Sequence, residues 1–308
     1  MGNKMIQVKE EIEKAVKGKS EIVEKVLAAM LAGGHILLED IPGVGKTTLA
    51  MSIAKSMALT YKRVQFTPDV LPSDIVGFSM YNPDSKTFEY QEGAVYCNLF
   101  LADEINRTSP KTQSALLEVM EEGNVTVDGV TRPLPSPFTV IATENPLGSS
   151  GTQMLPESQL DRFMVCLSMG YPDHDAAVHI LKDNASNPLS QLESAITVEE
   201  FVELRKKANT LYVHDSIYDY IVTLIEGTRT SELFSMGASP RGSIALLRMT
   251  KAMAVLHGRD YVTPEDIRSV FFDVLGHRVK LSTKARAEGM NVEEALASLF
   301  SQVKVPRT

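Results

Sequence analysis

The chain has 308 residues, of which 44% are hydrophobic and 23% are charged, and its formal net charge is −8. These proportions are ordinary for a folded globular protein and exclude extended disorder. The acidic balance disfavours broad attraction to DNA or to an anionic membrane, although it allows a local basic patch. No apolar run reaches the roughly 18 residues of a membrane span, and the start of the chain is too polar for a signal peptide, so we expect a cytoplasmic protein.

An apolar run, residues 36–38, leads into a glycine-rich loop and then into a helix, which is the arrangement of a phosphate-binding loop. Gly43 and Gly45 let the loop bend so that successive backbone N–H groups point at one anion. Lys46 adds a mobile positive charge, and Thr47 adds a hydroxyl group that can bind Mg²⁺. The helix behind the loop presents the positive end of its dipole. These features predict a site for ATP with Mg²⁺.

The loop departs from the strict P-loop pattern at one position, because Asp40 stands where the pattern has its first glycine. A glycine-rich turn without a ligand is therefore the alternative. Leu49, Ile53 and Met57 recur at helical spacing after the loop and support the strand–loop–helix interpretation. The residues that we assign to nucleotide binding in this segment are Asp40, Ile41, Pro42, Gly43, Val44, Gly45, Lys46, Thr47 and Thr48.

A second apolar strand, residues 99–102, ends in the carboxylates of Asp103 and Glu104, which is a Walker B pattern. Hydrolysis of ATP requires a metal ion that neutralises phosphate oxygens and a base that orients the attacking water. Asp103 suits the metal and the nucleotide, together with Thr47, and Glu104 suits the water. The alternative is that both acids cap the next element.

A third apolar strand, residues 138–143, is followed by Glu144, Asn145 and Pro146. The carboxyl ends of parallel strands meet at one edge of a sheet, where ligands bind. Asn145 is thereby placed to form a hydrogen bond near the γ-phosphate and the attacking water. An asparagine before a proline is alternatively a simple turn residue.

Two arginines occur in settings that favour contact with an anion. Arg162 precedes a fourth apolar segment, residues 164–169, and we interpret it as an arginine finger for the phosphate of a neighbouring subunit. A surface pair with Asp161 is the alternative. Arg241 lies in the first turn of a helix that we expect Ser239 to cap, where the helix end favours anions. Whether Arg241 serves its own subunit or a neighbour is left open.

Several segments together resemble the MoxR family of AAA+ ATPases, and the resemblance covers nearly the whole chain from Val16 onward. The segments are residues 39–47, 98–107, 142–146, 155–163, 239–241 and 273–279. The resemblance implies Walker A, Walker B, sensor 1, arginine finger and sensor 2 roles, respectively, for Lys46 with Thr47, Asp103 with Glu104, Asn145, Arg162 and Arg241. It also implies an ATP hydrolase that assembles into a homo-oligomeric ring, usually a hexamer. A chaperone-like activity toward protein clients, often with von Willebrand factor A domain partners, is implied as well.

Two segments predict β-hairpins inserted into the core. Residues 78–90 alternate aromatic and polar side chains around a turn, and we expect this hairpin to interrupt a helix. Residues 124–132 carry an Asp-Gly turn between β-branched residues. The family resemblance implies that such hairpins line the pore of a ring. Tyr81, Phe88 and Tyr90 are then candidates to grip a polypeptide, and the alternative is that they pack the hairpin onto its own domain.

From residue 171 onward the sequence lacks strand-like runs and shows amphipathic helices with clear start signals, such as the capping pair Thr197 and Glu200. The fold class is therefore α/β. We predict a P-loop AAA+ core over residues 1–170, in which helices enclose a parallel sheet with hairpin inserts, and an all-α lid over residues 171–308. Three helical stripes are expected to form the lid core: residues Phe201, Leu204, Ala208 and Leu211; Ile217, Ile221, Leu224 and Ile225; and Ile267, Val270, Phe271 and Val274.

The remaining metal-binding or reactive residue types favour no second site. Cys97 and Cys166 lie in or beside apolar segments, where small core residues are expected rather than a disulfide or metal ligands. His174 and His179 have no further ligand nearby in the sequence and are interpreted as surface residues.

Three functions are compatible with these features. We expect an ATP-driven machine that remodels or matures a bound protein client. The alternatives are a nucleic-acid motor on the same core, which the acidic composition disfavours, and a nucleotide-gated assembly scaffold with little turnover. Intact Glu104, Asn145 and Arg162 argue against the scaffold.

Overall fold

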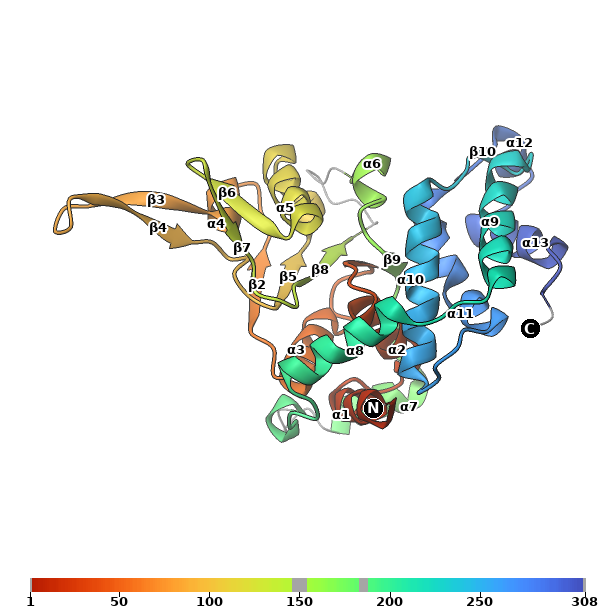
Figure 1. Cartoon of the computed structure of the whole chain (residues 1–308), viewed down its shortest axis with the longest axis horizontal. Coiled ribbons are helices and arrows are strands. Elements are labelled where there is room, and N and C mark those ends of the chain that lie inside the picture. Colours follow the sequence, from red (N-terminus) through yellow and green to blue (C-terminus); the bar gives the residue numbers. More distant parts are fainter. Residues whose placement is uncertain (1, 146–153, 183–187, 307–308) are drawn as a thin grey trace.

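Within residues 2–145, 154–182 and 188–306, which this computed structural model describes, five parallel strands form one sheet in the order β2-β5-β8-β1-β9 (Figure 1). The strands are β1 (Ile36–Glu39), β2 (Tyr61–Gln65), β5 (Leu99–Asp103), β8 (Thr139–Glu144) and β9 (Val165–Leu167). Every neighbouring pair is parallel, so the carboxyl ends of the strands lie at one edge, as the sequence predicts. Pro146 of the predicted strand-end motif lies outside the described residues.

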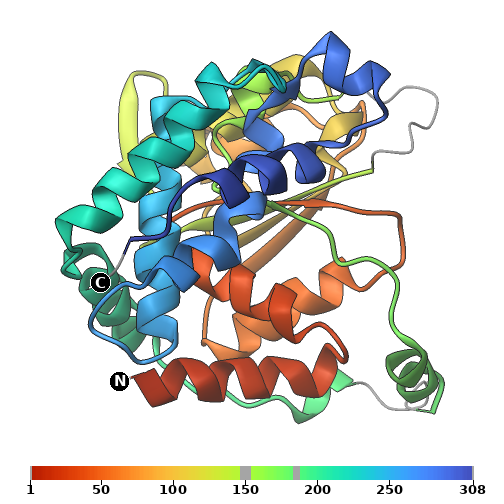
Figure 2. The same ribbon diagram turned by 90° about the vertical axis from the view of Figure 1, so that its right-hand side faces the viewer.

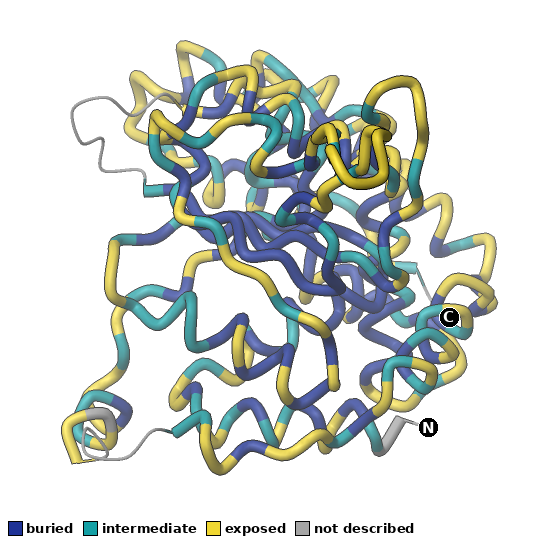
Figure 3. Tube along the Cα trace, turned by 90° about the vertical axis from the view of Figure 1, so that its left-hand side faces the viewer, coloured by how far each residue is buried: buried dark blue, intermediate teal, exposed yellow. Residues whose placement is uncertain are grey.

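Except for the edge strand β2, whose residues are exposed or partly exposed, the sheet is buried on both faces, and Figure 3 shows a block of buried strands in the middle of the molecule. In β1, Ile36 and Leu38 join one hydrophobic cluster, whereas Leu37 joins a second cluster on the opposite face. Leu101 and Phe100 of β5 divide in the same way. Successive side chains of a strand point to opposite faces, so an apolar run of this kind requires a cover on each side.

Helices near the two ends of β1 cover one face of the sheet (Figure 2). They are α1 (Gly2–Ala15), α2 (Ser20–Leu31) and α3 (Lys46–Ser56). Leu49, Ile53 and Met57 are buried at and beyond α3, as their spacing predicts. The sequence analysis did not predict α1, whose apolar side is buried against α3.

Two helices and two hairpins lie on the side of the opposite face, and the second hairpin contributes Val125 to its hydrophobic cluster. They are α4 (Pro72–Val76), α5 (Pro110–Glu122), the hairpin of β3 (Gly77–Asn82) and β4 (Thr87–Glu92), and the hairpin of β6 (Asn124–Val127) and β7 (Val130–Pro133). The β3–β4 hairpin projects far from the body of the protein (Figure 1). Our expectation that it interrupts a helix is wrong. The backbone after it does not start a helical turn, because the N–H groups of Ala94 and Val95 bond back to the carbonyl groups of Asp74 and Ile75.

The C-terminal part of the chain is largely helical. Its elements are α7 (His174–Lys182), α8 (Val198–Thr210), α9 (Asp215–Thr230), α10 (Pro240–Leu256), α11 (Pro264–Leu275), α12 (Thr283–Ala287), α13 (Val292–Gln302) and the 3-10 turns η3 (Pro188–Gln191) and η4 (Gly276–Arg278). The predicted capping pair is present, since Thr197 and Glu200 exchange side-chain and backbone hydrogen bonds. All residues of the three predicted stripes are buried.

The expectation of an all-α lid is wrong in one detail. β10 (Phe234–Met236) and β11 (Lys280–Leu281) form a short antiparallel pair among these helices. Strands of two and three residues are too short to show an alternating pattern. The sequence therefore carries no periodic signal for them.

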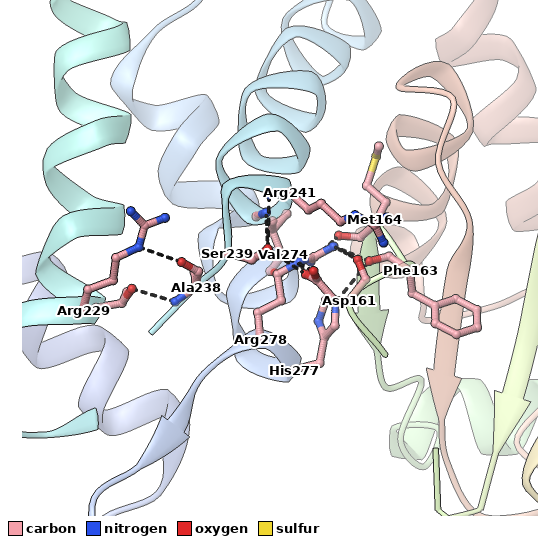
Figure 4. Close-up of polar contacts among 12 residues, drawn as sticks. Asp161, Phe163, Met164, Arg229, Ala238, Ser239, Arg241, Val274, His277 and Arg278 are labelled. Carbon is pink, nitrogen blue, oxygen red and sulfur yellow. Dashed lines mark hydrogen bonds and ion pairs between the residues drawn. The ribbon is translucent and has the colours of Figure 1, made fainter. Parts of the chain in front are cut away.

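A buried arginine joins the C-terminal helices to the sheet (Figure 4). The side chain of Arg278 is 2% exposed, and its Nε donates to Asp161 Oδ1 at 2.9 Å. Its terminal nitrogens donate to the carbonyl oxygens of Phe163 and Val274. Asp161 also accepts a hydrogen bond from Ser239 Oγ at 2.9 Å. One hydrophobic cluster continues from the sheet into these helices, so the packing does not mark a boundary between two domains. The division of the chain at residue 170 stays a prediction.

Replacing Arg278 with methionine should lower the free energy of unfolding by about 3 kcal/mol, because the largely buried carboxylate of Asp161 loses its counter-charge. Urea unfolding followed by circular dichroism measures this loss. Lys284→Met is the control, since Lys284 forms an exposed pair with Glu232 at 3.9 Å, and it should leave the stability unchanged. Equal losses in the two variants would contradict the prediction.

The cysteines and histidines singled out in the sequence lie where we expect them. Both cysteines are free, and burial raises the pKa of the Cys97 thiol to about 11. Burial also raises the pKa of Cys166. His174 and His179 are exposed. In the part of the chain that the structure describes, no helix is both long enough and apolar enough to cross a membrane.

Candidate functional site

The loop between β1 and α3 has the backbone conformation that a phosphate cradle requires. Gly43 and Gly45 have φ angles of 87° and 98°, in the left-handed region that strongly favours glycine. A Cβ atom on Gly43 would meet no other atom within 4 Å, so the need for glycine is conformational rather than steric. Lys46 Nζ donates to the carbonyl oxygen of Asp40 at 2.9 Å. Burial lowers the pKa of Lys46, and nearby carboxylates oppose this shift.

One pocket at the carboxyl edge of the sheet brings together most of the residues predicted to bind the nucleotide. Those that line it are Pro42, Gly43, Gly45, Lys46, Thr47, Asp103, Glu104 and Asn145. Val44 and Thr48 line a second pocket on the other side of the loop, and Ile41 is partly buried beside them in the chain. The hydroxyl of Thr47 and the carboxylate of Asp103 are hard oxygen ligands, and both fit Mg²⁺.

The structure gives Asp40 a different role from the predicted contact with nucleotide. Its side chain is 6% exposed and turns away from the loop. Asp40 Oδ1 accepts hydrogen bonds from Ser168 Oγ at 2.9 Å and from the N–H group of Gly170 at 3.0 Å, while Oδ2 accepts one from the N–H group of Met169 at 2.5 Å. Asp40 therefore anchors the start of the loop to the chain after β9. A glycine at this position could not make these bonds.

Asp103 is fixed from both neighbouring strands. Its Oδ1 accepts a hydrogen bond from Thr143 Oγ1 of β8 at 2.7 Å. Its Oδ2 accepts hydrogen bonds from Arg63 of β2, at 3.2 Å from Nε and 2.6 Å from Nη2. The sequence analysis did not identify Arg63 or Thr143, because their proximity to Asp103 follows from the strand order. Arg63 and Thr143 lie near the carboxyl ends of their strands, and this was the feature of the sequence that could have identified them.

Glu104 stands in a strained conformation. Its φ of 57° and ψ of 51° are left-handed, which non-glycine residues rarely adopt and which costs of order 1 kcal/mol. The N–H group of Glu104 donates to Thr143 Oγ1 at 2.8 Å. Its Oε2 accepts hydrogen bonds from Gln65 Nε2 at 2.8 Å and Arg107 Nη1 at 2.7 Å. Thr143 thus orients both acids. Gln65 holds the second acid toward β2, and Arg107, in η1 (Ile105–Arg107), contacts the same oxygen.

Asn145 lies at the tip of β8 beside the paired acids, as the sequence predicts. Its carbonyl oxygen accepts a hydrogen bond from Asn106 Nδ2 at 3.2 Å. The preceding residue, Glu144, is 1% exposed, and its Oε2 has no hydrogen-bond partner among the described residues. Burial, together with the nearby charge of Glu39, raises the pKa of Glu144 to about 7, although a hydrogen bond from Leu155 opposes the shift.

The raised pKa of Glu144 predicts a pH-dependent stability. Below pH 4.5, its ordinary pKa, the group is protonated in both the folded and the unfolded chain. Between pH 4.5 and about 7 the unfolded chain ionises at this residue while the folded chain still holds the proton, so the wild type should lose about 2–3 kcal/mol relative to Glu144→Gln from pH 5 to pH 8. Urea unfolding at pH 5 and pH 8 measures this difference. A wild-type-to-variant difference that is constant across this range would contradict the prediction.

The second pocket beside the loop is suited to a nucleotide base. Val16, Val44 and Met169 provide apolar walls, and Pro172 and His179 complete them. The C-terminal end of α1 forms one side of this pocket. Sequence reasoning assigned Val44 to nucleotide binding but missed the other four residues, because neither α1 nor the proximity of α7 to the loop has a motif that predicts it. His179 is therefore exposed but not remote from the nucleotide site.

Arg162 and Arg241 lie together in a third pocket, which shares no lining residue with the first two. Gly34 and His35, which precede β1, also line it, so it lies at the amino end of β1. The surface pair of Arg162 with Asp161 is not present, because Asp161 pairs with Arg278 instead. Ser239 caps α10 as predicted by accepting hydrogen bonds from the N–H groups of residues 241 and 242.

The sequence matches known families along most of its length. The family model of ATPases associated with various cellular activities (AAA) matches residues 35–165, and the AAA lid domain model matches residues 226–299. The chain is 37% identical to the chaperone MoxR1 of Mycobacterium tuberculosis, over 96% of this chain and 81% of that protein. It is 49% identical to the uncharacterised protein YeaC of Bacillus subtilis, over 96% and 93% of the two chains. A crystal structure of a candidate ATPase from Cytophaga hutchinsonii has a TM-score of 0.91 and 38% identity, and the match covers 99% of this chain and 96% of that one.

The parallel sheet, the phosphate loop and the paired acids at the strand tips define an AAA ATPase, an enzyme that binds and hydrolyses ATP. The identities to the MoxR proteins are more specific than the fold. The chain belongs to the MoxR family of AAA+ ATPases, and the resemblance stated from the sequence is confirmed.

Proposed function

We propose that this ATPase works as a homo-oligomeric ring, a hexamer, in which each ATP lies between the phosphate pocket of one subunit and the arginines of the next. The observation that carries this proposal is the position of Arg162 and Arg241 at the amino end of β1. The phosphate loop begins at the carboxyl end of the same strand. A strand of this length spans roughly 13 Å, further than an arginine side chain reaches. Both arginines are therefore assigned to a neighbouring subunit's phosphate.

Each junction of the ring then contains a complete set of groups for hydrolysis. Lys46 and the N–H groups of the loop hold the phosphates, Glu104 accepts the proton of the attacking water, and Asn145 orients that water. Arg162 and Arg241 of the adjacent subunit stabilise the charge that develops on the γ-phosphate. Mg²⁺, which Thr47 and Asp103 would hold, neutralises phosphate oxygens when bound.

Mixing two inactive variants tests whether the site is shared. Glu104→Gln should lower turnover by about 100-fold or more while ATP still binds, because the base is lost. Arg162→Ala should likewise lower turnover by about 10³-fold with little effect on ATP binding. A mixture should regain activity, since roughly a quarter of the junctions in a random ring pair an intact phosphate pocket with an intact arginine.

The wild type supplies the control for this experiment. Its specific activity should rise with protein concentration until the ring is saturated, as expected for a site that two subunits complete. A mixture that stays inactive, together with a specific activity independent of concentration, would refute the shared site.

We also propose that the ring acts on protein clients through the β3–β4 hairpin. Tyr81 and Phe88 form an edge-to-face pair with ring centroids 5.6 Å apart, and they are 51% and 74% exposed. Tyr90, the third candidate, serves packing instead, because its hydroxyl donates to the Val76 carbonyl group and Arg132 lies over its ring. The exposed pair supports contact with an extended polypeptide. The family resemblance supports a partner with a von Willebrand factor A domain.

Phe88→Ala should leave the basal hydrolysis rate unchanged and lower its stimulation by an unfolded polypeptide by about fivefold, since one aromatic contact contributes roughly 1 kcal/mol. Reduced and carboxymethylated lactalbumin is a suitable probe. Tyr212→Ala, at another exposed aromatic residue, is the matched control. Equal stimulation of all three proteins would count against the hairpin. Stimulation by DNA instead of polypeptide would favour the nucleic-acid motor.

The cytoplasmic location stays a prediction.

A further inference from the structure

Glu121, at the C-terminal end of α5, contacts both arginines that we assign to the neighbouring subunit's phosphate. Its Oε2 lies 3.4 Å from Arg162 Nη2. Its Oε1 accepts a hydrogen bond from Arg241 Nη2. One carboxylate oxygen therefore faces each guanidinium group, and the two arginines are bridged as two oxygens of a phosphate would bridge them.

The pocket around this bridge has an excess of positive charge. Arg162, Arg241 and Arg248 line the pocket, together with Arg278. Asp161 is the other acid among the described lining residues, and it is paired with Arg278. Glu121 thus remains as one negative charge for three positive ones.

Arg162 also carries an unpaired donor. Its Nε atom is buried and has no hydrogen-bond partner among the described residues. A buried donor without a partner costs free energy, and an anion that reaches this atom would remove that cost. Glu121, through its contact with a terminal nitrogen, leaves this Nε atom unsatisfied.

We propose that Glu121 is a positioning residue. Until the ring closes, its carboxylate occupies the position between Arg162 and Arg241 at which the terminal phosphate of the neighbouring subunit's ATP would bind. This inference rests on the proposed sharing of the ATP site. The carboxylate holds Arg162 and Arg241 side by side and shields their charges in the free subunit. When the triphosphate arrives, it displaces Glu121 and takes over both guanidinium groups.

Such a placeholder opposes assembly. Its negative charge repels the incoming phosphate, and its two ion pairs must be exchanged before the phosphate can bind. Both pairs are partly exposed, with side-chain exposures of 38% for Glu121, 30% for Arg162 and 52% for Arg241, so the exchange is inexpensive and reversible. Once Glu121 has been displaced, the closed junction has the same contacts with or without the carboxylate. Glu121 should therefore affect how readily the ring forms and not how fast the closed ring works.

Glu121→Gln tests this prediction, and Glu122→Gln is the matched control. Glu122 carries the same charge one position further along α5, and its side chain forms no ion pair with the residues that the structure describes. The readout is ATPase activity as a function of protein concentration, supported by light scattering with ATP and with ADP. Glu121→Gln should lower the protein concentration at half-maximal specific activity by about two- to fivefold and leave the plateau unchanged. The same shift should appear in the assembly seen by light scattering with ATP and be smaller with ADP, which lacks the terminal phosphate.

The possible outcomes separate this inference from the proposal on which it rests. If Glu121→Gln and Glu122→Gln give the same concentration midpoint while Arg162→Ala remains inactive, the role of Glu121 is refuted and the shared site stands. If Glu121→Gln lowers the plateau with no change of midpoint, Glu121 acts in catalysis and the placeholder is refuted. If the wild type shows no dependence on concentration and the mixture of Glu104→Gln with Arg162→Ala stays inactive, the shared site itself fails.

Discussion

The parallel direction of the strands is the constraint on which the rest of this structure depends. It places the tips of β1, β5 and β8, with their polar residues, at one edge of the sheet. The same direction places Arg162, which precedes β9, and the pocket before β1 at the opposite edge. Under the proposed function, one chain therefore carries two halves of an ATP site that face away from each other. The proposal requires these halves to meet where one copy of the chain touches another.

Two ion pairs near the amino end of β1 differ in burial and therefore in the cost of breaking them. Arg278 and Asp161 are held in a buried network of charged and backbone groups, and breaking such a network is costly. The pair of Arg241 with Glu121 is partly exposed and close to energetically neutral. The first kind fixes the C-terminal helices to the sheet, and the second can be exchanged. Asp161 and Arg162 are adjacent in the chain. The buried pair of Asp161 with Arg278 therefore lies next to the exchangeable pair of Arg162 with Glu121.

The core of the fold and most of the phosphate pocket could be predicted from the sequence, because each depends on local patterns. Buried parallel strands read as apolar runs, and the loop needs glycine for its left-handed backbone. Partners that depend on strand order could not be predicted in this way. Arg63 meets Asp103 because β2 lies beside β5, and no local pattern specifies that neighbour. Glu121 is likewise an ordinary exposed acid on a helix until the fold brings two arginines to it.

The position of Glu121 connects the proposed shared ATP site with the surface proposed for clients. It lies two residues before Gly123, whose left-handed backbone ends α5 and leads into the β6–β7 hairpin. Arg132 of β7 lies over the ring of Tyr90, 3.9 Å from its centroid, and Tyr90 is bonded to the base of the β3–β4 hairpin. Helices at subunit interfaces commonly shift by about 1–2 Å. The helix α5, the β6–β7 hairpin and the base of the β3–β4 hairpin contact one another in sequence. A shift of α5 on release of Glu121 would therefore move the base of the β3–β4 hairpin, and with it the exposed pair of Tyr81 and Phe88.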